Sequence, residues 1–238
     1  MGGINLTIIH TGTLNEHHIP YVVKVVQGEG SGELLSLQES VRSGLPEPAS
    51  LQPLSEEEFD YILKGNGLIL GVYVEGCLVA ARAVLFPPVD NNHLGKDVAI
   101  PRSEWSNVVY QETSFVSEKV RGNGLQKLLG VLIMEELTRS RADIDYICCT
   151  VAPFNIPSLK DKFVQGLMIG GLKRKYGGSW RYIFVKNLKR EFEILPPFKK
   201  VAMEEFQEQQ DLLSAGWMGV SLTEDDRGWK LIFGKKRC

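Results

Sequence analysis

The stretch Val120-Arg121-Gly122-Asn123-Gly124-Leu125 decides how the fold of this chain is interpreted. It follows a strand-like run at residues 107–116 and opens a helix-like run at residues 125–139. The first N–H groups of a helix have no intrahelical acceptor, and the helix dipole places partial positive charge there. The two glycines have no Cβ to keep a phosphate away from these N–H groups, and the arginine adds a cation. The stretch therefore predicts a phosphate site, although the same hexamer also occurs in ordinary turns.

The sequence after the glycine turn predicts a parallel crossover. Residues 125–139 place apolar side chains at 125, 128, 129, 132, 133 and 137, the period of a helix that buries one face. Residues 146–151 are continuously apolar, as in a strand covered on both faces. A strand, a helix and a buried strand in this order predict a right-handed parallel connection.

The sequence before the turn predicts a helix and a hairpin. Ser55 followed by three glutamates is a typical helix start, and this helix should end by residues 65–67. Strands are expected at 68–74 and 78–86, joined by a tight turn at Glu75-Gly76. Residues 4–10 fit a first strand, and the β-branched run 19–26 fits either a strand or a helix.

The remaining segments are connections and later elements. Residues 28–53 form a connector with a short helical pattern at 34–41, and 87–106 form a polar insertion. Helices are expected at 158–166 and 203–216, a strand at 180–188, and a terminal hairpin from 217–220 and 229–233. No internal repeat is evident in the sequence.

Composition and charge narrow the class of protein. The chain has 238 residues, 43% of them hydrophobic and 24% charged, which is ordinary for a globular protein. Its net charge of −2 gives no bias toward nucleic acid or an anionic membrane, and we expect neither as a partner. No apolar run approaches the ~20 residues that span a bilayer, and the N-terminus does not resemble a secretion signal. We therefore expect a cytoplasmic protein.

No metal is expected from the sequence. The four cysteines have no Cys-X-X-Cys or Cys/His spacing of the kind that binds zinc. The four histidines, at 10, 17, 18 and 93, form no metal-ligand pattern either.

The order of elements and two motifs resemble the GNAT superfamily of acyl-CoA-dependent N-acetyltransferases. The run Val116-Ser-Glu-Lys-Val-Arg121-Gly-Asn-Gly-Leu125 resembles that family's valine followed by Gln/Arg-X-X-Gly-X-Gly. The run Thr150-Val-Ala-Pro-Phe-Asn155-Ile-Pro-Ser158 resembles the end of the family's fifth strand, with its Asn-X-X-Ala/Ser. The resemblance covers about residues 55–190.

The resemblance implies a mixed α/β (α+β) fold, with a mostly antiparallel central sheet flanked by helices. It implies a single domain over 1–238, in which 191–238 extend the sheet or form a dimer face. The protein could therefore form a homodimer.

The resemblance also implies roles for individual residues. Phe115 and Val116 would offer backbone groups to the pantetheine arm of the cofactor, and the N–H groups from Arg121 to Leu125 would hold its pyrophosphate. Asn155 and Ser158 would contact the pantetheine or phosphate side. From the residues alone, Asn155 could instead be a helix cap or turn residue, and Val116 could be only a core residue.

The sequence departs from the family pattern at two positions. Lys119 stands at the first Gln/Arg of the motif, which keeps the charge but loses the planar donor fork. The tyrosine that often serves as general acid to the leaving thiolate is replaced by Lys162, beside Phe163. The tyrosine acid cannot be carried over, and we expect Lys162 to be a solvated helix residue.

Acetyl transfer to an amine favours a general base. An alkyl amine with a pKa near ~10 is neutral only about one time in a thousand at pH 7. Glu112 is the candidate base, because it lies on the strand leading to the glycine turn and shares a face with Ser114 and Val116 if side chains alternate. The alternative is an edge-facing or salt-bridged glutamate.

The leading hypothesis is direct transfer of an acetyl group from acetyl-CoA, as cosubstrate, to the amine of a small molecule. Residues 28–53 and 87–106 would carry the substrate specificity. The alternative is a catalytically weak or inactive acyl-CoA-binding sensor or scaffold, which the missing tyrosine favours. A nucleotide-binding P-loop is a third reading, but no Gly-Lys-Ser/Thr follows the glycines.

Overall fold

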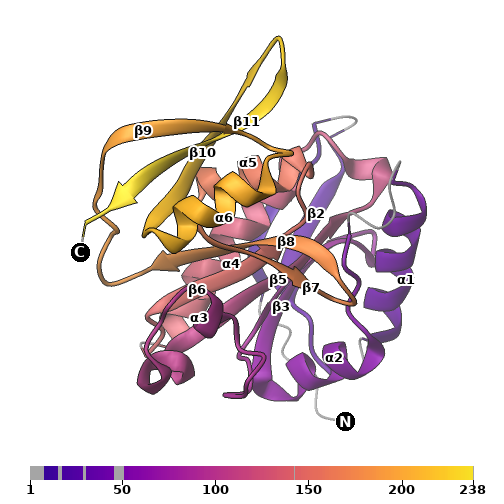
Figure 1. Cartoon of the computed structure of the whole chain (residues 1–238). Helices are drawn as coiled ribbons and strands as arrows, with labels where there is room; N and C mark the ends of the chain where they lie inside the picture. Colours follow the sequence, from indigo (N-terminus) through magenta and orange to yellow (C-terminus); the bar gives the residue numbers. More distant parts are fainter. Residues whose placement is uncertain (1–7, 16–17, 29–30, 46–50, 142, 238) are drawn as a thin grey trace. The chain divides into compact units, whose positions relative to one another are not determined.

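The computed structural model describes residues 8–15, 18–28, 31–45, 51–141 and 143–237. Within them the chain forms two compact units (Figure 1). The first comprises residues 1–86 and 111–142, and the second comprises 87–110 and 143–238. Strand β5 (Val108–Val116) contributes its first residues to the second unit and the rest to the first. The prediction of one domain over the whole chain stays a prediction.

The first unit is built on neighbouring strands in the order β1-β2-β3-β4-β5. Their bounds are β1 Ile8–Thr13, β2 Pro20–Val25, β3 Gly67–Val74 and β4 Cys77–Leu85. The β1–β2, β2–β3 and β3–β4 pairs are antiparallel. Glu75 (φ 50°) and Gly76 (φ 82°) close the β3–β4 hairpin with both central residues left-handed, which confirms the predicted tight turn. The ambiguous run 19–26 is a strand, and of the strand expected at 4–10 only residues from Ile8 onward are described.

Two helices precede β3. Helix α1 (Ser31–Ser43) is longer than the short pattern expected from sequence, and α2 (Glu56–Tyr61) continues as a π-helical turn, η2 (Ile62–Asn66). Ser55 caps α2 as predicted: its Oγ accepts from the N–H of Glu58 at 3.2 Å, and Glu58 Oε2 accepts from the N–H of Ser55 at 2.7 Å. The α2 start is therefore fixed by its own sequence.

The helices cover both faces of the first unit's strands. Helices α1 and α2 pack on one face of β3 and β4, against small residues such as Ala81 and Ala83 (Figure 1). On the opposite face, fully buried Arg82 donates to Gln111 Oε1 at 3.1 Å and to the Gln126 carbonyl of α4 (Leu125–Ser140) at 3.3 Å. A Cβ at Gly130 would lie 2.9 Å from the Arg82 guanidinium, so this helix-interior glycine makes room for the buried cation.

The insertion at 87–106, expected to be a polar loop, is a packed part of the second unit. It contains helix α3 (Leu94–Asp97) and a 3₁₀ turn, η3 (Arg102–Asn107). His93 is buried, stacks on Trp105 with ring centroids 4.7 Å apart, and accepts from the N–H of Gly95. Buried aromatic contacts therefore fix the insertion, although its overall composition is polar.

The strands of the second unit follow the order β5-β6-β8-β7-β10-β11-β9. Their bounds are β6 Tyr146–Val151, β7 Met168–Lys175, β8 Ser179–Asn187, β9 Ile194–Ala202, β10 Trp217–Asp225 and β11 Gly228–Lys236. Strands β5 and β6 are parallel, which confirms the predicted crossover, and the other recorded pairings are antiparallel. The mixed architecture with a mostly antiparallel sheet and flanking helices confirms the predicted fold class.

Two strands of this unit were missed from the sequence. Strand β7 contains adjacent glycines and ends in three cationic residues, so its apolar alternation is weak. Strand β9 contains two prolines, and it lies at the edge of the strand order, where proline is tolerated.

The second unit contains an internal repeat that the sequence alone did not reveal. The segment β6-α5-β7-β8 is followed by β9-α6-β10-β11, with the same order of strand, helix, strand and strand. The helices are α5 (Ile156–Val164) and α6 (Phe206–Ser214). The segments carry identical residues about 50 positions apart, at Val151 and Val201, Ala152 and Ala202, Asp161 and Asp211, Gly166 and Gly216, Met168 and Met218, Leu172 and Leu222, Trp180 and Trp229, Ile183 and Ile232, Phe184 and Phe233, and Lys186 and Lys235.

Backbone geometry supports the repeat. The residues before the helices, Asn155 (φ −74°, ψ 70°) and Glu205 (φ −82°, ψ 63°), share one conformation. The two segments meet at β7 and β10, where Ile169 pairs with Gly219, its own equivalent fifty positions later. Pairing of equivalent residues in antiparallel strands is what a two-fold axis produces. The second copy therefore occupies the position that a symmetry mate of the first would take in a dimer.

No helix among the described residues is long and apolar enough to cross a membrane.

Candidate active site

The glycine turn has the conformation that the sequence predicted. A short 3₁₀ turn, η4 (Glu118–Val120), leads into Gly122 (φ 83°), and Gly124 (φ 69°, ψ 10°) is the N-cap of α4. Both glycines are left-handed, a region that other residues rarely adopt. A Cβ at either position would meet nothing within 4 Å. The glycines are therefore needed for the backbone path, and the space in front of the turn is open.

The turn offers unused backbone donors. After the N–H of Arg121, the next backbone N–H with a recorded acceptor is that of Leu128, which donates to the Gly124 carbonyl at 3.0 Å. Across the described residues, the N–H groups of 122–127 have no protein acceptor, and no side chain caps the helix. Arg121 is exposed, and Lys119 and Lys127 are exposed nearby in sequence. The arrangement suits an anion bound at a helix N-terminus.

Asn123 holds the turn in place. Its side-chain amide donates to the Val120 carbonyl at 3.0 Å and to the Arg121 carbonyl at 3.3 Å. Its Oδ1 accepts from the N–H of Asn15 at 2.7 Å, which ties the turn to the β1–β2 connection. The motif predicted a role for the N–H of Asn123, and the bracing by its side chain is an addition from the structure.

Strand β5 carries its side chains onto both faces of the first unit. Gln111 contacts Arg82 and Met134 on the α4 side. Phe115 is buried and packs edge-on against Phe59 of α2, with ring centroids 6.5 Å apart. Strict alternation would place residues 111 and 115 on the same face, so we infer an irregularity in β5 between them. From residue 112 to 116 exposure alternates, with Thr113 and Phe115 buried and residues 112, 114 and 116 only partly buried, as their expected common face requires.

Glu112 carries the one carboxylate of strand β5. It is partly buried, and its pKa is raised from 4.5 to about 7, first by desolvation and second by the nearby Glu58 carboxylate. Within the described part of the chain no ion pair of Glu112 is recorded, so the salt-bridged alternative finds no support. A carboxylate with a pKa near neutrality can accept a proton at physiological pH.

The other predicted residues of β5 have mixed environments. The Phe115 side chain belongs to the core, while Val116 is partly exposed. Ser114 Oγ is buried without a hydrogen-bond partner among the described residues. After Val116, the N–H of Ser117 donates to the Val79 carbonyl at 2.8 Å, so the pairing with β4 persists to the start of the glycine turn.

Asn155 and Ser158 lie in the second unit, at the start of α5. Asn155 Oδ1 accepts from the N–H of Ser158 at 3.3 Å, so the capping role left open by the sequence is present. Their contact with a cofactor stays a prediction.

Lys162 is not the solvated residue that the sequence suggested. It is 7% exposed, and its Nζ lies 3.3 Å from Asp161 Oδ2. The prediction was wrong because Lys162 lies on the inward side of α5, with Leu159, where its stem is covered. Its burial assigns it a packing role beside a carboxylate.

One tyrosine that the sequence did not single out lies near the end of β6. The Tyr176 hydroxyl is 3.0 Å from Thr150 Oγ1, and Tyr176 occupies the left-handed turn between β7 and β8. This turn was overlooked because strand β7 was not predicted from the sequence. Tyr176-Gly177-Gly178 is a hairpin signal only between two strands.

Comparison with known proteins identifies the fold. No protein-family model matches the chain, and no curated protein matches it. Among solved structures, a GNAT-family acetyltransferase from Listeria monocytogenes superposes with a TM-score of 0.55 at 17% identity, over 75% of this chain and 100% of that one. An N-acetyltransferase from Staphylococcus aureus gives 0.52 at 11%, over 71% and 98%. A ribosomal-protein-alanine N-acetyltransferase from Brucella melitensis gives 0.52 at 13%, over 70% and 99%. The chain therefore has the GNAT acetyltransferase fold.

Proposed function

We propose that this chain, with the fold of GNAT acetyltransferases, is an N-acetyltransferase that transfers the acetyl group of acetyl-CoA directly to the amine of a small molecule. The observation that carries the proposal lies within the first unit. A glycine turn with unused N–H donors follows directly on a strand whose glutamate has a pKa of about 7. An anion cradle and a proton acceptor on consecutive segments are what acyl transfer from a phosphorylated cosubstrate requires.

The residues of the turn fit the pyrophosphate of CoA. The left-handed glycines leave the space before the N–H groups empty, and Arg121 is exposed beside them. In the proposal, residues 121–125 hold the pyrophosphate, and backbone groups of Phe115 and Val116 align the pantetheine arm. When bound, acetyl-CoA supplies an activated acetyl thioester.

Glu112 serves as the base. The amine nitrogen forms a bond to the acetyl carbon, the carbon–sulfur bond breaks, and the amine proton passes to Glu112 directly or through a water. The leaving thiolate takes a proton from water and departs as the free thiol of CoA. The scheme needs no metal, and no group of three or more His, Cys, Asp or Glu side chains within the described ranges could hold one.

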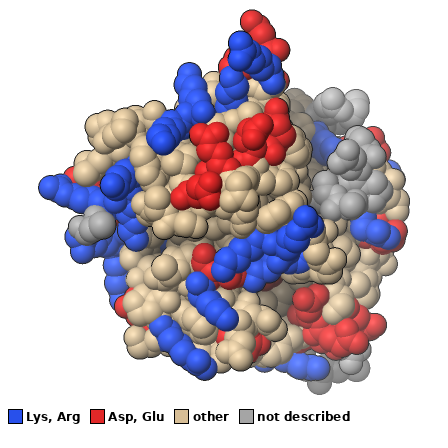
Figure 2. Space-filling view, viewed as in Figure 1, with Lys and Arg blue, Asp and Glu red and all other residues tan. Residues whose placement is uncertain are grey.

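An acidic patch beside the proposed base favours a cationic substrate. Glu56, Glu57 and Glu58 occupy the first turn of α2, and Figure 2 shows carboxylates gathered over this helix. Glu58 is the residue whose charge raises the pKa of Glu112. An alkylammonium would be attracted to this patch before it loses its proton.

The proposal also covers the location, the partners and the oligomeric state of the enzyme. We propose a cytoplasmic enzyme that acts on a small amine without nucleic acid or a membrane. A homodimer remains part of the proposal, but the β7 edge is already paired with β10 of the same chain. A dimer cannot therefore form through pairing at this β7 edge.

A second candidate function is an acyl-CoA-binding sensor or scaffold with little or no catalysis. The observation that favours it is Lys162, a buried lysine at the position of the expected tyrosine. Both candidates need the same cofactor turn, so binding and turnover have to be measured separately.

Calorimetry with acetyl-CoA, CoA and ATP tests the shared part of the two candidates. We expect binding of both CoA compounds and none of ATP. Gly124→Glu should abolish CoA binding, because a carboxylate would occupy the turn and repel phosphate. Gly76→Glu is the matched control, since Gly76 is also left-handed with nothing within 4 Å of its Cβ position. Wild-type affinity in Gly124→Glu would refute the placement, and no CoA binding by the wild type would refute both functions.

Release of free thiol from acetyl-CoA, measured across a panel of alkyl amines, separates the enzyme from the sensor. Amine-dependent release that is lost in Gly124→Glu supports the enzyme. CoA binding without release for any amine on the panel supports the sensor.

A further inference from the structure

Two adjacent cavities lie within the second unit. One has a volume of about 400 Å³ and the other about 370 Å³. They share a wall formed by Val98, Ala99, Val185, Phe192 and Lys236. Cavities of this size suit small organic ligands.

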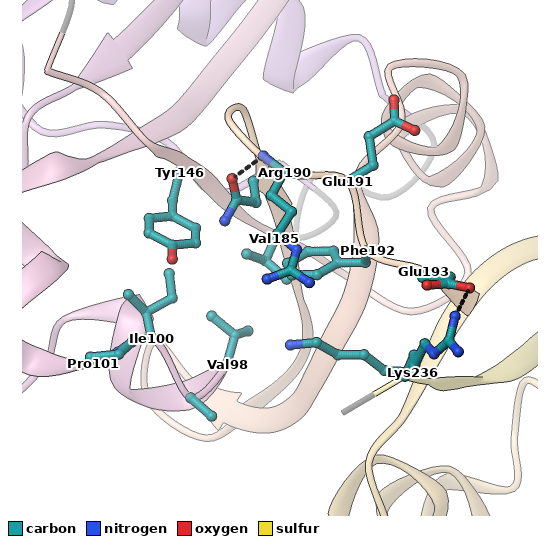
Figure 3. A pocket seen from close by; sticks show the side chains of 13 residues that line it. Val98, Ile100, Pro101, Tyr146, Val185, Arg190, Glu191, Phe192, Glu193 and Lys236 are labelled. Carbon is teal, nitrogen blue, oxygen red and sulfur yellow. Dashed lines mark hydrogen bonds and ion pairs between the residues drawn. The ribbon is translucent and has the colours of Figure 1, made fainter. Parts of the chain in front are cut away.

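Two cations of the first cavity have no carboxylate partner among the described residues. Figure 3 shows the side chains of Arg190 and Lys236 directed into the cavity from opposite walls, with Glu191 directed away from it. Glu193 is engaged elsewhere, because its Oε1 lies 2.6 Å from Arg237 Nη1. No ion pair of Arg190 or Lys236 is recorded in the part of the chain that the structure describes. The Lys236 ammonium lies 4.6 Å from the centroid of the Phe192 ring, which places it over an aromatic surface.

The second cavity is lined largely by apolar side chains, including Leu172, Leu213, Trp217 and Met218. Its carboxylate, Asp97, is neutralised by Lys173 at 2.6 Å and Lys175 at 2.5 Å. The first cavity, called the cationic cavity from here on, therefore lies beside an apolar one, and Lys236 lines both.

A strained residue forms part of the shared wall. Ala99 has a φ of 57°, in the left-handed region, which costs about 1 kcal/mol or more for a residue with a Cβ. Such strain persists where the surroundings fix the backbone, and it is concentrated at binding sites.

The cavities are separate from the proposed cofactor contacts of this unit. Tyr146, the first residue of β6, lines the cationic cavity, while Asn155 lies four residues beyond Val151, the last residue of that strand. At about 3.3 Å per residue, the two ends of β6 lie about 17 Å apart along the strand. Arg190 comes from the connection between the two repeats, and Lys236 comes from the end of the second repeat. The cation pair therefore depends on the second copy.

We propose that these cavities form a second ligand site for a small organic acid with an apolar body. The carboxylate is held between Arg190 and Lys236, and the apolar body extends past Phe192 into the cavity lined by Leu213, Trp217 and Met218. Arg190 provides a planar donor fork that matches a carboxylate, and Lys236 provides a second charge.

Fluorescence of anilinonaphthalene sulfonate, an aromatic anion, measures the site in the full-length protein. Excess CoA is added throughout so that the glycine turn does not bind the probe. We expect saturable binding at one site, with displacement by decanoate but not by methyl decanoate or inorganic phosphate. Arg190→Gln and Lys236→Gln should each weaken decanoate binding about tenfold. Lys235→Gln is the matched control, because this exposed neighbour lines neither cavity.

Three results would overturn the proposal. Equal displacement by methyl decanoate would show that the acid is not recognised, and displacement by phosphate as effective as by decanoate would show that the apolar cavity is not used. Unchanged affinity in both cation variants would place the probe elsewhere. Val98→Trp, which fills the shared wall, provides a second check: retained decanoate binding in this folded variant would also contradict the assignment.

Discussion

Replacement of Glu112 by glutamine tests the proposed base, and it should also make the folded protein more stable at neutral and alkaline pH. Desolvation and the Glu58 carboxylate both disfavour the charged form of Glu112. The folded protein therefore holds a proton at pH values where the unfolded chain has released it. Between 4.5 and about 7, the stability conferred by this group is lost as the pH rises. Glutamine carries no charge, so the variant does not lose this stability as the pH rises.

The magnitude follows from the shift in pKa. The difference between about 7 and 4.5 is about 2.5 pKa units. At 1.36 kcal/mol per unit, this sets a ceiling of about 3 kcal/mol. Glu112 is only partly buried, and solvent screening lowers the effect. We expect Glu112→Gln to be about 1–2 kcal/mol more stable than the wild type at pH 8, and the difference to vanish below pH 4.5.

Urea denaturation at pH 4.5, 6 and 8 measures the difference in the free energy of unfolding. Glu135→Gln is the control, since Glu135 is exposed on α4. A stability difference for Glu112→Gln that is independent of pH would refute the raised pKa.

The same variant tests catalysis. The wild-type kcat should rise with pH to a plateau above about 7, where Glu112 becomes able to accept a proton. Glu112→Gln should lower kcat at least tenfold and abolish this rise, while leaving the affinity for CoA unchanged. An unchanged pH profile of kcat in the variant would remove Glu112 as the base.

Two further predictions concern the glycine turn and the α2 cap. Asn123→Ala should weaken CoA binding about tenfold by calorimetry, because it removes the hydrogen bonds that hold the turn; wild-type affinity would show that the turn needs no brace. Ser55→Ala should reduce the free energy of unfolding by about 1 kcal/mol through loss of the α2 cap, and no change in denaturation midpoint would contradict the capping assignment.

Local signals in the sequence were sufficient where a backbone conformation depends on residue type. The Glu75-Gly76 turn, the Ser55 cap and the glycine turn were all predicted in place, because left-handed positions and helix caps accept few residues. The buried strand at 146–151 was also predicted, since a strand covered on both faces has a continuous apolar sequence.

The repeat was not recognised from the sequence, because its identical pairs are separated by residues that differ between the copies. Conserved pairs such as Trp180 and Trp229 are scattered, while the helix caps changed from Asn155 to Glu205. The shared backbone angles at these caps, and the pairing of Ile169 with its own equivalent, were needed to relate the copies.

By itself the sequence determined the glycine turn, the strand that precedes it and the parallel crossover, because each depends on residues close together along the chain. The tertiary structure decided the environment of each side chain. It raised the pKa of Glu112 to about 7 by desolvation beside Glu58, buried Lys162, and brought Arg190 and Lys236 into one cavity. Desolvation and the convergence of like charges arise from packing between distant segments, which the order of residues along the chain does not show.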